Sequence, residues 1–187
     1  MTSASDNIVR VWQMSEGASA IESPVLSTDE EAIGSPIQSA CWDEEDGSMI
    51  LTASKDLMCR AYDPRSGSKP CMVGQCAEQS KGFTARWLED RNAILTLGFK
   101  RGTEATRFFQ LWDKRMLSRC LTSVVVDSLP YSFVPFYEPS SGVLFLGSRG
   151  NTTCAYEIHS LQPFVHQVSK FVHENNRFLK SRKDGYR

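Results

Sequence analysis

The chain has 187 residues, of which 41% are hydrophobic, 23% charged and 10% aromatic, so it can build a sizeable core and disorder along its whole length is excluded. Its formal net charge of -1 gives no overall electrostatic footprint for nucleic acid, so we expect no nucleic-acid partner. No run approaches the roughly 18 apolar residues of a membrane helix, and the first residues lack the basic and apolar regions of a secretory signal. We therefore expect a soluble cytoplasmic protein without a transmembrane segment.

The near-zero net charge hides a separation of charge along the chain. Nine acidic and no basic residues lie between Arg10 and Lys55, whereas 20 basic and 12 acidic residues occur from Lys55 onward. A chain with segregated charge can present a basic face to an acidic partner. The alternative is that the acidic residues form a solvated loop and the basic residues are scattered.

Four segments share one pattern, in which turn residues precede an alternating run that ends in an aromatic residue. These aromatic residues are Trp12, Tyr62, Trp112 and Tyr156, and they lie 50, 50 and 44 residues apart. A fixed period of this length marks a repeat architecture. Within the repeats, Asp6 and Asp56 occupy matching positions, as do Arg10 and Arg60.

Two further strand candidates precede each of the later aromatic residues, separated by turns rich in Gly, Asp, Asn and Pro. About four short strands in each repeat of ~45 residues are typical of a β-propeller blade made of antiparallel sheet. The first repeat is expected to begin at the third strand of a blade, with an outer strand at 24–27. The strand candidates of the later repeats lie at 39–42, 49–53, 83–88, 93–97, 131–137 and 143–147.

Several longer stretches share their residue order with one family of WD-repeat proteins. Residues 54–67, which contain Asp63, Pro64 and Arg65 before a final Gly67, are similar to a coronin segment of the form D-P-R-x-G. Further stretches that resemble coronin elements, in the same order, lie at 96–101, 134–139, 147–150, 156–158 and 163–166.

The coronin resemblance implies an all-β fold, a partial WD-repeat β-propeller of about 3.5–4 blades of antiparallel four-stranded sheet. We expect residues 1–171 to form this incomplete propeller, as a fragment of a seven-bladed ring, and residues 172–187 to form a basic, frayed tail. The sequence has no Gly-His pair, so the Asp-His-Ser-Trp hydrogen-bond tetrad that braces many WD blades cannot be complete.

No pattern indicates catalysis, a cofactor or a metal. The chain has neither a Gly-x-Ser-x-Gly elbow nor a Walker-type phosphate loop. Its six cysteines do not fit the ligand spacing of a zinc site. We therefore expect a protein that is not an enzyme, with no catalytic residue, no metal ligand and no cofactor.

Basic residues near the predicted loops are the candidates for partner binding. Between Lys55 and Arg119 there are 13 basic and seven acidic residues, and function in a propeller resides in the loops. The alternative is solvated blade surface, since isolated exposed charges contribute little. The candidates are Lys55, Arg65, Lys69, Lys100, Arg101, Arg107, Lys114 and Arg115.

The coronin resemblance implies a scaffold that binds actin filaments, regulates the organisation of the actin cytoskeleton and is linked to membrane traffic. It implies actin-branching machinery as a further partner and a cytoplasmic, cytoskeleton-associated location, with oligomerisation only through a coiled coil outside this chain. Two alternatives stay open. One is a WD-repeat adaptor that binds other proteins but not actin, and the other is a truncated product without a stable function.

Overall fold

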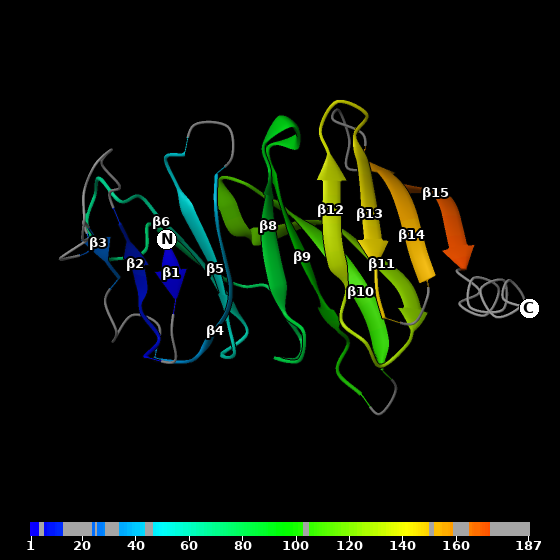
Figure 1. The fold of residues 1–187 in the computed structure, drawn as a ribbon, viewed down its shortest axis with the longest axis horizontal. Coiled ribbons are helices and arrows are strands. Elements are labelled where there is room, and N and C mark those ends of the chain that lie inside the picture. Colours follow the sequence, from blue (N-terminus) through cyan, green and yellow to red (C-terminus); the bar gives the residue numbers. More distant parts are fainter. Residues whose placement is uncertain are drawn as a thin grey trace, which may run out of the picture.

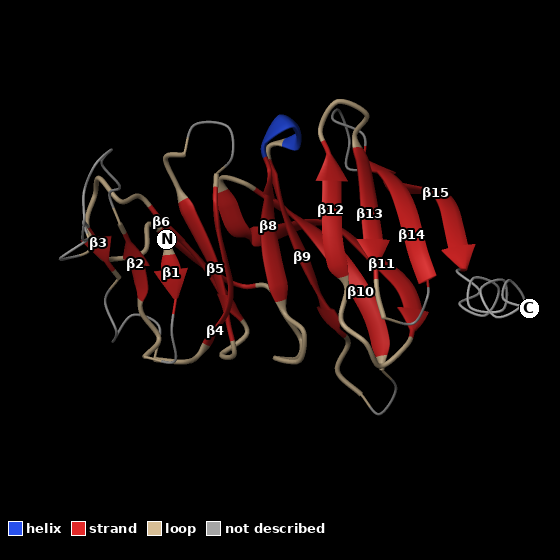
Figure 2. Ribbon diagram, viewed as in Figure 1, coloured by secondary structure: helices blue, strands red, loops and turns tan. Residues whose placement is uncertain are grey.

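The computed structural model describes residues 1–3, 6–12, 24, 26–28, 34–43, 47–102, 105–149, 152–158 and 165–172. In this part of the chain, fifteen strands form four antiparallel sheets, and the one short 3₁₀ helix is η1 (Glu89–Arg91). The sheets, which we number 1 to 4 in chain order, stand side by side along the long axis of the molecule (Figure 1). Strands account for nearly all of the regular structure (Figure 2), which confirms the all-β prediction.

Sheet 1 has three strands and sheet 2 has four, and in both sheets the strands follow sequence order. In sheet 1 the short strand β1 pairs with β2, in addition to the two strands that the sequence predicted for the first repeat. The outer strand predicted at 24–27 is present as β3. The strands are β1 (Thr2–Ser3), β2 (Val9–Val11), β3 (Leu26–Ser27), β4 (Ile37–Trp42), β5 (Ile50–Ser54), β6 (Met58–Tyr62) and β7 (Met72–Gln75).

Sheets 3 and 4 are complete four-stranded sheets with the same sequential order. β15 includes residue 172, the first of the predicted tail, and the rest of that tail lies outside the described residues. The strands are β8 (Thr84–Leu88), β9 (Ala93–Phe99), β10 (Thr106–Asp113), β11 (Met116–Ser128), β12 (Val134–Glu138), β13 (Val143–Gly147), β14 (Thr152–Ile158) and β15 (Val165–Val172).

The core lies between neighbouring sheets rather than inside any one of them. Side chains alternate between the two faces of a strand. We call the face toward the next sheet in the chain the forward face and the opposite one the back face. At the junction of sheets 2 and 3, Leu51 and Ala61 of the forward face pack in one cluster with Trp87 and Trp112 of the back face.

The junction of sheets 3 and 4 repeats this arrangement. Phe109 on the forward face of sheet 3 meets Tyr156 on the back face of sheet 4, with ring centroids 5.0 Å apart in an edge-to-face geometry. At the junction of sheets 1 and 2, Val9 packs with Ile50 and Tyr62. Three of the four repeated aromatic residues, Tyr62, Trp112 and Tyr156, are therefore back-face core residues that pack against the preceding sheet.

Antiparallel pairing sends successive loops to opposite ends of the molecule. One end, at the bottom of Figure 1, carries the β5–β6, β9–β10 and β13–β14 loops and the connections between sheets. We call this end the lower rim. The other end carries the β4–β5, β8–β9 and β12–β13 loops and the β6–β7 and β10–β11 loops, and we call it the upper rim.

Candidate partner-binding surface on the lower rim

The turn between β5 and β6 is held by a buried network of polar side chains. The two terminal nitrogens of Arg60 donate to Ser54 Oγ at 2.8 Å and to Asp56 Oδ2 at 2.6 Å. Ser54 Oγ donates to Asp56 Oδ1 at 2.6 Å, and the backbone N–H of Met58 donates to the same oxygen at 3.1 Å. Burial opposes ionisation of Asp56, but the hydrogen bonds from Arg60 and Ser54 outweigh it, so the pKa of this carboxyl lies below its usual value. The exposed Lys55 side chain thus projects from a rigid turn.

These hydrogen bonds cross-link the β5–β6 turn in a repeat that lacks the complete Asp-His-Ser-Trp tetrad. In sheet 1 the matching residues form the same ion pair, since Arg10 lies 2.6 Å from Asp6. In sheet 3 one link of the usual tetrad survives, because Trp112 Nε1 donates to Thr96 Oγ1 at 2.8 Å.

Arg107 was predicted from the sequence to lie on a binding surface, but the structure buries it. Its side chain is fully buried, and Nε and one terminal nitrogen donate to the two carboxylate oxygens of Asp127 at 2.5 and 2.6 Å. The other terminal nitrogen donates to the Tyr131 carbonyl at 2.8 Å, and the guanidinium lies 3.8 Å from the centroid of the Phe133 ring. A buried guanidinium with all of these partners cannot contact a binding protein.

The structure divides the seven remaining candidates between the two rims instead of gathering them in one patch. Lys55, Lys100 and Arg101 lie on the lower rim, in the β5–β6 and β9–β10 loops. Arg65, Lys69, Lys114 and Arg115 lie on the upper rim, in the β6–β7 and β10–β11 loops.

Two of the four upper-rim candidates, Arg65 and Lys114, are matched by acidic neighbours. Arg65 Nε lies 3.0 Å from Asp63 Oδ1. Lys114 Nζ lies 3.4 Å from Asp43, a buried carboxylate of the preceding sheet, and 5.7 Å from the centroid of the Trp87 ring. Lys114 therefore ties sheet 2 to sheet 3, and its charge is compensated within the fold.

The lower rim carries two more cations that the sequence prediction omitted, Lys81 and Arg149, both exposed. Lys81 precedes β8 and lies over the Phe99 ring at 4.7 Å, and Arg149 follows β13 at the position that Lys55 holds after β5. That equivalence is a signal that sequence alignment of the repeats could have found. We call the full set the lower-rim cations: Lys55, Lys81, Lys100, Arg101 and Arg149.

Few acidic groups oppose the lower-rim cations. Among the residues that the structure describes, none of the five forms an ion pair. In sheets 2 to 4, Asp56 and Asp127 are bound to buried arginines, and Glu78 accepts a hydrogen bond from the Arg101 backbone N–H at 3.0 Å. Unpaired cations on one rim produce a positive potential that attracts acidic surfaces.

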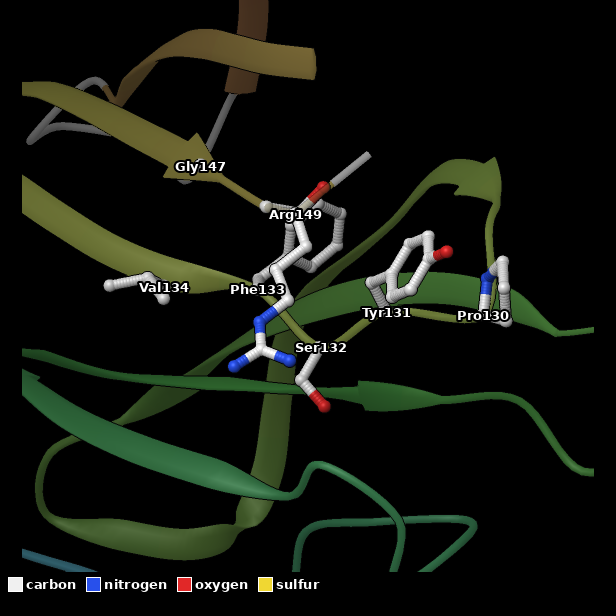
Figure 3. Close-up of a pocket in the computed structure, with 8 residues that line it drawn as sticks. Pro130, Tyr131, Ser132, Phe133, Val134, Gly147 and Arg149 are labelled. Carbon is white, nitrogen blue, oxygen red and sulfur yellow. The ribbon is translucent and has the colours of Figure 1, made fainter. Parts of the chain in front are cut away.

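A pocket of about 670 Å³ opens on the same rim, between the β11–β12 connection and the β13–β14 loop (Figure 3). Residues 130–134 and 147–149 line it, and they include the exposed Tyr131 and Arg149. Ser148 Oγ is buried and has no hydrogen-bond partner among the described residues. The pocket combines apolar walls with a guanidinium, which suits a side chain or short segment of an acidic protein.

The described ranges contain neither a metal-ligand cluster nor a membrane-spanning helix. The His, Cys, Asp and Glu residues placed by the structure form no group of three or more that could hold a metal ion. No helix in the described part of the chain is long and apolar enough to cross a membrane.

The architecture has clear relatives, although no protein-family model matches the chain. The fold is similar to the WD40 domain of a Toxoplasma gondii coronin, with a TM-score of 0.67 and 18% sequence identity, over 90% of this chain and 54% of that one. The four sheets and their sequential strand order therefore define a partial WD-repeat β-propeller, as the repeats predicted.

Sequence comparison is more specific. The chain is 31% identical to mouse Coronin-7 over 164 residues and 30% identical to Dictyostelium discoideum Coronin-A over 130 residues. These matches cover 87% and 68% of this chain but only 17% and 28% of the two relatives. The chain is thus a coronin homologue over most of its length and corresponds to a small part of the whole proteins.

Proposed function

We propose that this chain belongs to a coronin-like scaffold that binds actin filaments and regulates the organisation of the actin cytoskeleton. The observation that carries the proposal is the set of lower-rim cations, which form no ion pair with any residue that the structure describes and so favour an acidic surface such as that of a filament. Homology to coronins supports the same assignment. The scaffold acts without catalysis, in the cytoplasm and in association with the cytoskeleton, with actin-branching machinery as a further partner and a link to membrane traffic.

Cosedimentation with actin filaments at increasing salt tests the proposal. Binding by exposed cations weakens as salt screens the charges, because the Debye length falls from about 10 Å at 0.1 M to about 3 Å at 1 M ionic strength. We expect the folded chain to pellet with filaments at low salt and to remain in the supernatant at high salt. A folded chain that does not pellet at low salt would remove the claim of direct binding.

Matched charge reversals identify the rim. The lower-rim variant changes Lys55, Lys100 and Arg101 to Glu, and the control changes Arg65, Lys69 and Arg115 on the upper rim to Glu, so the change in net charge is the same. We expect only the lower-rim variant to lose pelleting. Equal loss in both variants would show that overall charge, and not the lower rim, determines binding.

The pocket favours a second function, that of a WD-repeat adaptor that binds a protein segment and not actin. Its apolar walls predict binding that resists salt. The adaptor would be supported by a partner that remains bound at high salt and is released by Val134→Asp in the pocket wall, together with no pelleting with actin.

A further inference from the structure

Sheet 4 keeps the serine of the β5–β6 turn of sheet 2 but not the residues that bind it. The pairing of β13 with β14 and of β5 with β6 places Ser148 at the position of Ser54. Ser54 Oγ donates to Asp56 and accepts a hydrogen bond from Arg60. Ser148 Oγ, in contrast, is buried and has no hydrogen-bond partner among the described residues. A buried hydroxyl without a partner costs free energy, so a ligand that supplies the missing hydrogen bond is favoured.

The substitutions behind this difference also remove a carboxylate from the turn. At the positions of Asp56 and Arg60 the fourth repeat has Gly150 and Cys154. The exposed Arg149 is therefore not followed by an acidic residue, as the equivalent cation of sheet 2 is. None of the residues that line the lower-rim pocket is acidic, whereas Arg149 is one of them. The polar part of the pocket is therefore positively charged.

Ser132 and Lys81 bring further hydrogen-bond donors to the pocket. Ser132 lines it, and a Cβ atom at Gly82 would overlap Ser132 Oγ, so the segment before β8 lies against this wall. Lys81 precedes Gly82, and its Nζ lies 4.7 Å from the centroid of the Phe99 ring. Figure 3 shows the Arg149 side chain reaching across the pocket toward Ser132. An ammonium group, a guanidinium and serine hydroxyls thus lie in or beside one cavity.

This set of donors suits a phosphoryl group better than a carboxylate. A carboxylate has one charge and two oxygens, whereas a phosphorylated side chain carries a charge of about −1.5 to −2 and three acceptor oxygens. The guanidinium of Arg149 can bind two of these oxygens side by side, and the Lys81 ammonium balances the second charge. Asp127 does not compete for these cations, because both of its carboxylate oxygens bind the buried Arg107.

The apolar walls of the pocket indicate what carries the phosphoryl group. Pro130, Phe133 and Val134 line the pocket together with the exposed ring of Tyr131. A cavity of about 670 Å³ has room for a modified side chain and its neighbours in a peptide. A headgroup at the flat surface of a membrane would leave these walls in contact with water, so the pocket favours a protein segment.

We propose that the lower-rim pocket binds a phosphorylated side chain of a partner protein. The apolar walls contact the flanking residues, and the phosphoryl group is bound by Lys81, Ser132, Ser148 and Arg149. A change of the χ1 rotamer turns the Ser148 hydroxyl toward this group, because the residue as a whole is only partly buried. The proposal specifies the ligand of the adaptor function described above and rests on that function.

The binding of peptide pools to the full chain, measured by fluorescence anisotropy, tests this ligand. The labelled peptides have randomised flanking residues and a phosphorylated serine, threonine or tyrosine at the centre, and matched pools carry the unmodified residue or Glu there. We expect the phosphorylated pools to bind about tenfold more tightly than either matched pool at low salt. The ratio should fall at high salt, because salt screens the phosphoryl contacts but not the apolar ones.

The pools also separate this proposal from the adaptor function. Equal binding of all pools, abolished by Val134→Asp in the pocket wall, would overturn the phosphoryl ligand and leave the adaptor in place. Absence of binding by every pool would contradict both.

Single substitutions locate the contact. Arg149→Ala and Ser148→Ala should each weaken the binding of the phosphorylated pools by about tenfold and leave the unmodified pools unchanged. Lys69→Ala on the upper rim removes the same charge as Arg149→Ala and should have no effect. Ser148→Ala should not lower the midpoint of urea unfolding, because the hydroxyl has no partner to lose, so its loss of binding cannot result from unfolding. Wild-type binding by both pocket variants would overturn the proposal.

Two further probes distinguish other sources of a phosphoryl group. Inorganic phosphate that displaces the phosphorylated pools at equal concentration would show a site for the free anion. Phosphatidylcholine vesicles that contain phosphatidylinositol phosphate would show a membrane contact if they bind more tightly than the peptides and are released by Arg149→Ala. We expect neither result, and either one would overturn the assignment to a protein segment.

Discussion

The guanidinium of Arg107 lies 3.8 Å from the centroid of the Phe133 ring while it binds both carboxylate oxygens of Asp127. This one side chain links β10, the end of β11 and the connection to β12, because it also donates to the Tyr131 carbonyl. The wall of the lower-rim pocket therefore rests on a buried ion pair. Arg107 supports the candidate surface from below and is not part of it.

Replacement of Arg107 should reduce stability far more than replacement of a lower-rim cation. Arg107→Ala leaves the carboxylate of Asp127 without its partner, and removal of one member of a buried pair typically lowers the free energy of unfolding by about 3–5 kcal/mol. Lys100→Ala, the control, should change it by less than about 0.5 kcal/mol. Urea unfolding measures both, and an Arg107→Ala variant as stable as wild type would contradict the structural role.

The repeated Asp–Arg pair should matter more in sheet 2 than in sheet 1. The Arg60 side chain is 9% exposed and the Arg10 side chain 29%, although both pairs have the same 2.6 Å separation. Arg60→Ala removes one hydrogen bond to Ser54 Oγ and leaves the partly buried Asp56 carboxylate without its cation, which should lower the free energy of unfolding by about 2–3 kcal/mol. Arg10→Ala should lower it by no more than about 1 kcal/mol. Chemical denaturation of the two variants should preserve this order, and equal losses would argue against burial as the cause.

Gly74 of β7 lies close to Leu117 of β11, where the outer strands of sheets 2 and 3 meet. A Cβ atom at this position would lie 2.5 Å from Leu117 Cβ and 2.6 Å from the Leu117 carbonyl oxygen. Relief of this clash requires a shift of the backbone, which costs free energy. Gly74→Ala should therefore destabilise the chain by about 1–3 kcal/mol.

Gly98 provides the matched control, because it lies in the buried strand β9 and a Cβ atom there would meet nothing within 4 Å. Gly98→Ala should be neutral or slightly stabilising, since alanine restricts the unfolded chain. Thermal unfolding of the pair should show a lower midpoint only for Gly74→Ala.

The spacing of the periodic aromatic residues predicted the four sheets, and three of these residues, Tyr62, Trp112 and Tyr156, fill the same back-face core position. Tyr62 and Trp112, for example, mark the period of the repeat in the sequence and also pack between neighbouring sheets. The rims could not be assigned in this way. Lys55 and Arg65 are only ten residues apart in sequence, yet a single intervening strand, β6, places them at opposite ends of the molecule.

The misassignment of Arg107 has a different origin. The residues next to a basic side chain that follows a polar turn look the same whether that side chain faces solvent or binds a carboxylate far away in the sequence. Asp127 lies 20 residues further along the chain and becomes a neighbour only through the pairing of β10 with β11. Contacts of this kind cannot be predicted from residue spacing within one repeat.

Tyr156 should make the junction of sheets 3 and 4 sensitive to alkali. Burial, with smaller effects from Cys154 and Asp127, raises the pKa of its phenol to about 12 from a usual value of 10.0. The unfolded chain then releases this proton at a lower pH than the folded chain, so the phenol's contribution to stability is complete below pH 10 and is lost as the pH rises toward 12.

Tyr156→Phe keeps the edge-to-face contact with Phe109 but removes the ionisable hydroxyl. Unfolding in urea across this pH range should therefore show a shallower fall of the free energy of unfolding for Tyr156→Phe than for wild type. Parallel curves would mean that the phenol ionises equally easily in the folded and unfolded chains.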